Sequence, residues 1–388
     1  MTDIRKSLYL DAMASTPVDP RVAAAMVPFW SETFGNPHSN DHEFGWRANA
    51  AVVEAATRIA RLIGADSDEI VFTSGATEAN NLAILGLAHR APRERRRILV
   101  SAIEHNCILA AANVAAERYG MACEHLVVDR DGRIDLDYLA TRLSDDVLCV
   151  AAMAVNNEIG TVQDLEAIAG LAARSGAVFI CDAVQAPLAI DIDVGKHPIG
   201  SLALSAHKLY GPKGIGALYL RRDLQQAVEP LIYGGGQQNG LRSGTLPTPL
   251  CVGFGVAAEI AASDERHAER ARIAAIRDAF ESALGSLDPS LSFNGCGAQR
   301  HPGNSNVRFG TRDGRHLLSI MQPHLAASTG SACTSGTTEP SHVLRAIGLS
   351  KDEANASVRF SFGRFNSSRD ADEAVLIIAS AMTMDRAA

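Results

Sequence analysis

The stretch Ser205-Ala206-His207-Lys208-Leu209-Tyr210-Gly211-Pro212-Lys213-Gly214-Ile215-Gly216 places a lysine directly after a histidine and just before a Gly/Pro turn. Apolar segments flank this stretch on both sides, and we expect them to form strands Leu202–Ser205 and Gly216–Leu220. A lysine at the end of a buried strand is partly desolvated, which favours the neutral amine. A neutral amine can hold an aldehyde as a Schiff base, although a solvated surface lysine is the alternative for this stretch taken alone.

Around this stretch, short apolar runs alternate with longer helical patterns, which is typical of βαβ units and a mostly parallel sheet. The expected strands are Glu69–Thr73, Ile98–Ser101, Val147–Ala154, Val178–Asp182, Leu202–Ser205 and Gly216–Leu220. The expected helices are Arg47–Ile63, Thr77–Ala88, Ile108–Tyr119, Leu165–Ser175 and a long one from about Ala257 to Leu284. Beyond the long helix the segments become shorter and richer in Gly, Asn and Pro, so we place a domain boundary near residue 260.

Length and composition exclude several classes of protein. The 388 residues suffice for a large core, and the 47% hydrophobic content is ordinary for a globular protein. No apolar run is long enough to cross a bilayer, and Met1–Lys6 lacks an apolar signal core, so we expect a cytoplasmic protein without membrane contact. The net charge of −8 indicates no direct nucleic-acid partner. The seven cysteines show no Cys-x-x-Cys spacing, which argues against a disulfide framework or a zinc ribbon, and we expect no metal.

The segment Ser74-Gly75-Ala76-Thr77-Glu78-Ala79-Asn80-Asn81 follows an expected strand and opens an expected helix. Its small residues let the backbone approach an anion, and the N–H groups of a first helical turn can hold a phosphate. Thr77 is a candidate N-cap of this helix. A plain strand-to-helix turn is the alternative. A second anion contact is expected from the segments Gly234–Gly236 and Arg242–Thr245.

Polar side chains follow the other expected strands, where an open α/β sheet binds its ligands. Asp182 ends one strand and Gln185 follows it, while His105 and Asn157 come after two more strands. Pyridoxal phosphate (PLP) is an aldehyde whose proteins supply a lysine such as Lys208 and a carboxylate for the pyridinium nitrogen. Asp182 suits that carboxylate, Gln185 can hydrogen-bond the ring, and the imidazole of His105 can stack on it and transfer protons.

Two further residues are candidates for chemistry near the carboxyl end of the chain. Cys333 lies among small and hydroxylated residues in Ser328–Gly336, where an exposed thiol suits a nucleophile that must move. An incidental loop cysteine is the alternative. Arg359 alternates with apolar residues in Ser357–Arg364, and its guanidinium fork would fit an amino-acid carboxylate. Arg364 competes for the same role.

Together these residues closely resemble one family, the group I (IscS/NifS-like) cysteine desulfurases, which belong to the class V aminotransferase family of PLP enzymes. The matching segments occur in order along nearly the whole chain, and their combination is specific. They are Leu10-Asp11, Gly35-Asn36-Pro37, Thr73–Asn81, Glu104-His105, Asn156–Gly160, Asp182–Gln185, Ser205–Gly216, Arg242–Pro247, Ser331–Arg345 and Arg359–Phe365.

The resemblance implies the α/β architecture of the PLP-dependent transferases of fold type I. A large PLP-binding domain, residues 16–260, would contain a mostly parallel seven-stranded sheet. A small α+β domain, residues 1–15 and 261–388, would carry the loop with the catalytic cysteine. The chain would act as a homodimer.

The resemblance also implies the role of each site residue. Lys208 would hold PLP and remove the α-proton of the substrate, Asp182 would pair with the ring nitrogen, and His105 would stack on the ring. The other cofactor contacts would come from Asn157, Gln185, Ala76, Thr77, Ser205, His207 and, from the second subunit, Thr245. Asn36 and Arg359 would hold the substrate carboxylate, and Cys333 would take the sulfur as a persulfide.

The implied reaction converts L-cysteine to L-alanine and passes sulfane sulfur to an acceptor protein. Another PLP reaction, such as that of an aminotransferase or a selenocysteine lyase, would keep Lys208 and Asp182 but would not need Cys333. A non-catalytic protein with this fold is a further alternative, which the full set of polar strand-end residues disfavours. The destination of the sulfur stays open among iron–sulfur cluster assembly, tRNA thiolation and sulfur modification of DNA.

Overall fold

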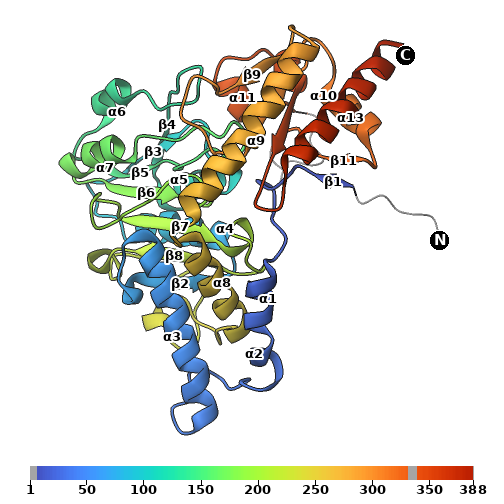
Figure 1. Ribbon diagram of the computed structural model, residues 1–388. Coiled ribbons are helices and arrows are strands. Elements are labelled where there is room, and N and C mark those ends of the chain that lie inside the picture. Colours follow the sequence, from blue (N-terminus) through green and yellow to red (C-terminus); the bar gives the residue numbers. More distant parts are fainter. Residues whose placement is uncertain (1–6, 331–338, 388) are drawn as a thin grey trace.

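The main sheet of the computed structural model has seven strands within residues 7–330 and 339–387, the part of the chain that the structure describes (Figure 1). Its strand order is β2-β8-β7-β6-β5-β3-β4. These strands are β2 (Ile70–Thr73), β3 (Arg97–Ser101), β4 (Ala122–Leu126), β5 (Val147–Ala151), β6 (Val178–Asp182), β7 (Ser201–Ser205) and β8 (Gly216–Leu220). Only β8 runs antiparallel to its neighbours in this sheet, β2 and β7. The expected α/β fold with a mostly parallel seven-stranded sheet is confirmed.

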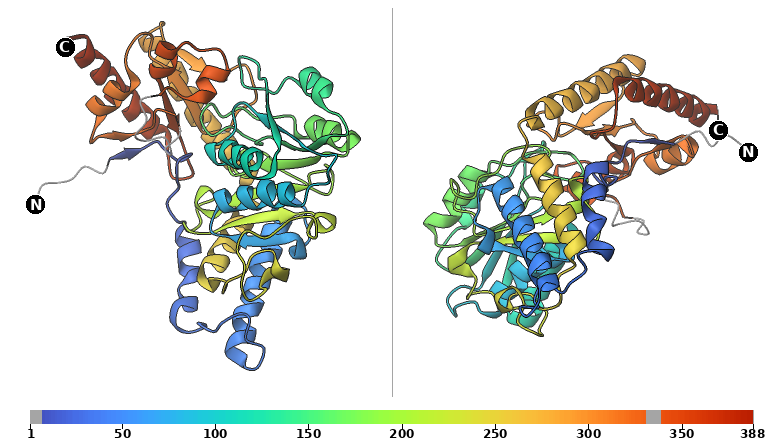
Figure 2. Two further views of the ribbon diagram at one scale, coloured as in Figure 1. Left: turned by 180° about the vertical axis from the view of Figure 1, so that it is seen from behind. Right: turned by 60° about the horizontal axis from the view of Figure 1, so that its bottom comes forward.

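Helices cover both faces of the sheet, as the views from the front and from behind show (Figures 1 and 2). One face carries α3 (Glu43–Ile63), α7 (Leu165–Arg174) and α8 (Thr248–Ala261), and the other carries α4 (Ala76–His89) and α5 (Asn106–Tyr119). Helix α3 begins at the His42 cap and ends at Gly64, whose φ of 71° is the left-handed conformation that glycine adopts readily. Its apolar stripe includes the fully buried Ile59 and Ile63, each of which contributes about 1.5–3 kcal/mol by burial.

Both ends of the chain join a second, smaller group of elements. A three-stranded antiparallel sheet has the order β12-β10-β9, and a parallel pair joins β1 (Leu8–Tyr9) to β11 (Leu325–Ala326). The three-stranded sheet consists of β9 (Ser292–Asn294), β10 (Asn304–Arg308) and β12 (Ser357–Ser361). The helices here are α9 (Arg266–Leu287), α10 (Gly314–Met321), α11 (His342–Ala346), α12 (Lys351–Asn355) and α13 (Ser368–Ala387). An apolar core of its own lies in this part, yet the exact domain boundaries stay a prediction.

The remaining helices are short: α1 (Pro20–Met26) and α2 (Pro28–Ser31) precede α3, and α6 (Leu136–Arg142) lies between β4 and β5. In the described part of the chain, no helix combines the length and the apolar character that a membrane span requires.

Three sequence-based expectations were wrong. The long helix from about Ala257 to Leu284 is two helices, because α8 ends at Ala261 and α9 starts at Arg266. The Arg266 guanidinium donates to the carbonyls of Ala262 and Ser263 and so binds free carbonyls at the end of α8. Strand β4 was not expected, since Glu124 and His125 interrupt the apolar run in its sequence Ala-Cys-Glu-His-Leu, as an edge strand tolerates. Strand β5 stops at Ala151, three residues before the expected end.

The topology brings several chain segments to one edge of the main sheet. Strands β3, β5, β6 and β7 are parallel, so their carboxyl ends lie at the same edge. Strand β2 is antiparallel to β8, which is antiparallel to β7, and therefore β2 ends at that edge too. The turns that follow these strands contain the polar residues of the expected site.

Candidate active site

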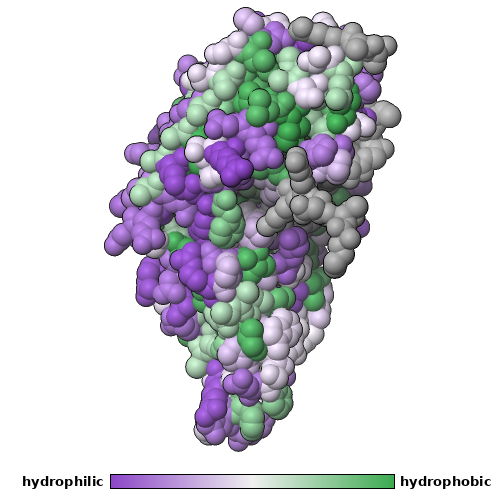
Figure 3. All heavy atoms as spheres, turned by 45° about the vertical axis from the view of Figure 1, so that its right-hand side comes forward, coloured by the Kyte–Doolittle hydropathy of each residue, from purple (hydrophilic) through white to green (hydrophobic). Residues whose placement is uncertain are grey.

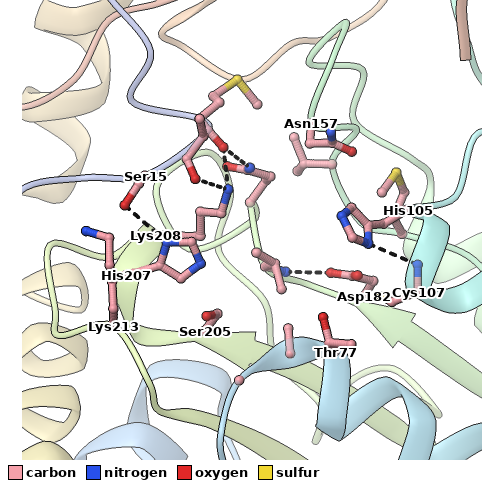
Figure 4. A pocket seen from close by; sticks show the side chains of 18 of the residues that line it. Ser15, Thr77, His105, Cys107, Asn157, Asp182, Ser205, His207, Lys208 and Lys213 are labelled. Carbon is pink, nitrogen blue, oxygen red and sulfur yellow. Dashed lines mark hydrogen bonds between the residues drawn. The ribbon is translucent and has the colours of Figure 1, made fainter. Parts of the chain in front are cut away.

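A cavity of about 520 Å³ lies at this edge of the main sheet (Figure 4). Its lining combines turns after the strands with the N-terminal segment Met13–Ser15 and with β12. The expected site residues among the lining are Ala76, Thr77, His105, Asn157, Asp182, Gln185, Ser205, His207, Lys208 and Arg359. The fold therefore brings together side chains that are up to 283 positions apart in the sequence, from Ala76 to Arg359.

Lys208 lies on a short 3-10 turn, Ala206–Lys208, directly after β7. Its Nζ donates to the backbone carbonyls of Met13 at 2.5 Å and Ala14 at 2.8 Å. The same N-terminal segment fixes the turn itself, because Thr16 Oγ1 donates to the His207 carbonyl and accepts from the Tyr210 N–H. The lysine is thus half-buried and points into the cavity beside two carbonyl oxygens (Figure 4).

Asp182 is the last residue of β6, and its side chain is buried at the floor of the cavity. Oδ2 accepts a hydrogen bond from Asn80 Nδ2 at 2.9 Å, and Oδ1 accepts one from the Val184 N–H at 3.0 Å. Two donors from different elements therefore fix the plane of this carboxylate.

His105 caps the start of α5, where its Nδ1 accepts from the Cys107 N–H at 3.1 Å. Burial, and then the Lys208 and His342 charges, outweigh Asp182 and lower the pKa of His105. The preceding Glu104 is fully buried, and one carboxylate oxygen, Oε1, accepts from the Met153 N–H at 2.6 Å. Burial and then the charge of Asp182 raise the pKa of Glu104 well above its usual range. The lowered pKa of His105 favours its neutral ring, and the raised pKa of Glu104 favours its protonated form.

The turn from β2 into α4 is open toward the cavity. A Cβ at Gly75 would meet nothing within 4 Å, and residues 74–78 line the cavity, so the start of α4 borders its open space. Gly216 packs beneath this turn, where a Cβ would lie 2.7 Å from Gly75 Cα, and only glycine allows that approach. Gly75, not Thr77, occupies the N-cap position, so the expected N-cap was wrong by two residues. Thr77 instead lies in the first turn of α4 with its side chain at the cavity (Figure 4).

His207 and Ser205 lie beside this turn. The imidazole Nδ1 of His207 is 3.3 Å from Ser15 Oγ. Burial, followed by the charges of Lys208 and Lys213, lowers the pKa of His207 to about 4. The ring is therefore neutral at pH 7, and it can donate or accept a hydrogen bond at an anion without adding a charge.

Arg359 is a buried guanidinium that lines the cavity, with 1% of its surface exposed. Nη1 donates to the Asn157 carbonyl at 2.7 Å, and Nη2 donates to Asp11 Oδ1 at 2.6 Å. Nε is buried and has no partner among the described residues. Arg364, the competing candidate, pairs with Asp19 and Glu269 and does not line this cavity. Of the two candidates, only Arg359 therefore lies where a ligand in the cavity could meet it.

Two expected residues do not reach the cavity within a single chain. Asn36 and Thr245 are both exposed, and neither lines the cavity. Cys333 lies outside the described residues, between Gly330 and Glu339.

The sequence analysis missed several residues that shape the site. Asn80 lies within the quoted Ser74–Asn81 segment, and its position one helical turn after Thr77 was a usable signal. Cys107 lines the cavity, where burial and then the charge of Asp182 raise the pKa of its thiol to about 12. The carbonyls of Met13 and Ala14 left no signal in the sequence, since every residue type has a carbonyl.

These residues fit PLP. The cavity offers a lysine amine, a carboxylate at the end of β6, a flat imidazole and an open helix N-terminus flanked by a neutral histidine. An aldehyde, a pyridine nitrogen, an aromatic ring and a phosphate are the complementary groups of that one cofactor. Within residues 7–330 and 339–387, no cluster of three or more His, Cys, Asp or Glu side chains could hold a metal ion.

Comparisons with known proteins agree with this geometry. The family model described as aminotransferase class-V matches residues 8–373. A cysteine desulfurase IscS from Rickettsia typhi is 45% identical over 373 residues, which cover 96% of this chain and 90% of that protein.

Solved structures give the same result. A NifS-like protein superposes with a TM-score of 0.91 at 30% identity, covering 98% of this chain and 100% of its own. SspA in complex with cysteine superposes with a TM-score of 0.82 at 38% identity, covering 93% of this chain and 100% of its own. The chain therefore belongs to the class-V aminotransferase family and, within it, to the IscS/NifS-like cysteine desulfurases.

Proposed function

We propose that this protein is a PLP-dependent cysteine desulfurase that converts L-cysteine to L-alanine and keeps the sulfur as a persulfide on Cys333. The observation that carries the proposal is the placement of Lys208, Asp182, His105 and Arg359 around one cavity. The identity to IscS proteins over nearly the whole chain supports the choice of reaction. An aminotransferase or a selenocysteine lyase is less favoured, because neither reaction uses Cys333.

Each group of residues in the cavity would bind a different part of the cofactor. Lys208 would form the covalent link, Asp182 would pair with the ring nitrogen, and His105 would stack on the ring, which Asn157 and Gln185 would also contact. Ala76, Thr77, Ser205 and His207 would bind the phosphate. Bound PLP withdraws electrons from the α-carbon of an attached amino acid. Asp182 would keep the ring nitrogen protonated for that purpose, and its two hydrogen bonds hold its carboxylate in place.

Lys208 also moves the protons of the reaction. Its amine would serve as the general base that removes the substrate α-proton. The carbonyls of Met13 and Ala14 hold this nitrogen at the cavity by direct hydrogen bonds. The substrate carboxylate would bind the guanidinium of Arg359, which lines the same cavity.

Cys333 completes the reaction. Its thiolate attacks the substrate sulfur, an S–S bond forms, and the bond between sulfur and Cβ breaks. The electron pair of that bond stays with carbon, which takes a proton and becomes the methyl group of alanine. The substrate sulfur is oxidised to the sulfane level while Cβ is reduced, so no outside oxidant is needed.

We propose that the protein is a homodimer in which each subunit completes the site of the other. Exposed aromatic side chains gather on α2, α3 and the loop between them: Trp30, Phe34, Phe44 and Trp46, each 51–65% exposed. Residues of intermediate or high hydropathy cover much of the lower half of the molecule, where α1–α3 lie (Figures 1 and 3). Such a patch marks a protein interface. Asn36 is on the same loop, and Asn36 and Thr245 would reach the partner's cavity.

Sedimentation at micromolar concentration tests the dimer. Trp46→Glu places a charge in the patch and should yield monomers that retain PLP poorly. Leu376→Glu is the matched control, because Leu376 is an equally apolar exposed residue on α13. A monomeric wild type would contradict the homodimer.

The protein would act in the cytoplasm, where an acceptor protein collects the sulfur for iron–sulfur cluster assembly, tRNA thiolation or DNA modification. Trapping the acceptor from lysate after loading the enzyme with labelled cysteine would identify the pathway.

Cys333→Ser tests the function itself. A hydroxyl cannot replace a thiolate in the attack on sulfur, so the variant should bind PLP and cysteine but form little alanine. Mass spectrometry of the wild type should place one extra sulfur on Cys333. The trapped sulfur on another cysteine, or alanine formation at the wild-type rate in Cys333→Ser, would contradict the proposed mechanism.

A further inference from the structure

The two chain segments that flank Cys333 meet at one buried carboxylate, that of Glu158. Ser341 Oγ donates to Glu158 Oε2 at 2.5 Å. On the other side of Cys333, a Cβ built on Gly330 would lie 3.3 Å from the same Oε2 and 3.6 Å from Ser341 Cβ. The Ser341 flank therefore binds Glu158 Oε2, and the Gly330 flank lies near the same oxygen, which belongs to a residue in the turn after β5.

The backbone around Glu158 fixes this carboxylate. Glu158 is buried, with 2% of its surface exposed. The Glu158 N–H donates to Asn156 Oδ1 at 2.8 Å, and its carbonyl accepts from the side chains of Asn304 at 3.0 Å and Asn306 at 3.1 Å. Three side-chain hydrogen bonds thus hold the main chain of one residue, and Glu158 cannot follow Ser341 if that residue shifts.

The helix that starts after Ser341, α11, is tied to the same sheet edge a second time. His342 Nε2 lies 2.8 Å from the carbonyl oxygen of Glu104. A small apolar cluster beneath these contacts contains Ile103, Ile159, Val343, Leu344 and Ile347. Glu104 and Glu158 each adjoin a residue that lines the cavity, His105 and Asn157 respectively. Two polar contacts, from Ser341 and His342, and one apolar cluster therefore attach the segment after Cys333 to residues next to the cavity lining.

We propose that Glu158 is a positioning residue for the sulfur-transfer step. By accepting a hydrogen bond from Ser341, with Gly330 close by, it holds the described residues on either side of the Cys333 segment at the turn after β5. This inference rests on the proposed function, since it concerns the step in which the Cys333 thiolate takes the substrate sulfur. Glu158 does not line the cavity itself, so it should leave cofactor and substrate binding alone.

An ordinary helix cap is the competing explanation, because Ser341 Oγ also accepts from the Leu344 N–H at 3.3 Å. Ser350 provides a matched control. It caps α12 in the same way, accepting from the Glu353 N–H at 3.2 Å, and its described contacts do not include Glu158. Ser341→Ala and Ser350→Ala therefore remove equivalent caps, and only the first removes the contact to Glu158.

The experiment uses the PLP-loaded enzyme and measures three quantities for each variant. These are PLP retention, the spectral change on binding L-cysteine, and the single-turnover rate of persulfide formation on Cys333. Ser341→Ala should lower the persulfide rate about tenfold, the effect of losing a hydrogen bond to a charged group, and leave the other two quantities unchanged. Ser350→Ala should change none of them. Glu158→Gln should retain most of the wild-type rate of persulfide formation, because its amide oxygen still accepts from Ser341. Glu158→Ala should lower that rate as much as Ser341→Ala does.

Equal persulfide rates in Ser341→Ala and Ser350→Ala would overturn the proposal. Hydrogen exchange supplies a readout that does not depend on activity: the peptide from Gly330 to Leu344 should exchange faster in Ser341→Ala than in Ser350→Ala or in the wild type. A wild type that forms no persulfide on Cys333 would contradict the proposed function. Unchanged hydrogen exchange in Ser341→Ala would contradict only the role of Glu158.

Discussion

Asn80 donates a hydrogen bond from Nδ2 to Oδ2 of Asp182 at 2.9 Å, joining the second turn of α4 to the end of β6. The same nitrogen is 3.5 Å from the sulfur of Cys107, and Asn80 Oδ1 has no partner among the described residues. Asn80 and Asp182 are both buried, with 0% and 5% of their surfaces exposed. A buried amide that leaves its own oxygen unsatisfied while donating to a carboxylate indicates that the orientation of Asp182 matters.

Asp182→Asn should keep the fold and lose about a hundredfold or more in kcat, because an amide cannot hold the pyridine nitrogen protonated. Asn80→Ala should cost less, about tenfold, since it frees the Asp182 carboxylate to rotate but leaves its charge. Steady-state kinetics with a melting temperature for each variant would check both. Asp182→Asn with most of its activity would show that Asp182 does not face the ring nitrogen.

Lys208→Ala should abolish the covalent link to PLP and all turnover. Lys213→Ala is the matched control, because Lys213 lines the same cavity and is exposed. After borohydride reduction and denaturation, intact mass spectrometry should find the cofactor mass on the wild type and on Lys213→Ala, and not on Lys208→Ala. Cofactor mass on Lys208→Ala would assign the link to another lysine.

The sequence predicted the main sheet and most of the cavity because both depend on local patterns. Strands β6 and β8 match their expected bounds, since a buried parallel or central strand is a continuous apolar run. The polar residues after the strands follow from the rule that such ends share one edge. Both signals can be read within a dozen residues.

The failures have a different cause. Strand β4 is an edge strand without a continuous apolar run. The break between α8 and α9 depends on Arg266, whose partners are fixed only by the tertiary fold. The pairing of Asp11 with Arg359 joins residues 348 positions apart. Contacts of that range carry no periodicity, so local patterns could not predict them.

The fold should lose stability as the pH falls below about 6.5, and His301 should contribute to the loss. Burial, followed by the charges of Arg277 and Arg270, lowers the pKa of His301 to about 3 in the folded protein. Its ordinary pKa is about 6.5, so between these values the unfolded chain binds a proton that the folded chain does not. Protonation therefore favours unfolding, and the stabilising effect of the neutral ring is present above pH 6.5 and lost below it.

Urea unfolding at pH 7 and pH 5 would measure this. For one such histidine the free energy of unfolding should fall by about 2 kcal/mol between the two values. His301→Asn keeps an acceptor for the Gly303 N–H, which donates to His301 Nδ1 at 3.1 Å, and should reduce the loss by that amount. His324→Asn, at an exposed position, serves as the control. An equal pH dependence in the wild type and His301→Asn would contradict the prediction.

Arg359→Lys should weaken the binding of L-cysteine while preserving the positive charge next to Asp11. A lysine ammonium is a compact charge without the planar fork, so it cannot donate to the Asn157 carbonyl, to Asp11 and to a substrate carboxylate in the present geometry. We expect KM for L-cysteine to rise about tenfold or more, with PLP retention unchanged.

Two comparisons make the Arg359 prediction specific. Cysteamine lacks the carboxylate, so its dissociation constant should be the same for Arg359→Lys and the wild type. Arg364→Lys alters another ion-paired arginine, one that is half-buried and does not line the cavity, and should leave KM for L-cysteine unchanged. If Arg359→Lys weakened cysteamine as much as L-cysteine, Arg359 would support the shape of the cavity and would not bind the carboxylate. If only Arg364→Lys raised KM, the competing arginine would hold the substrate, and the donor without a partner on Arg359 would need another explanation.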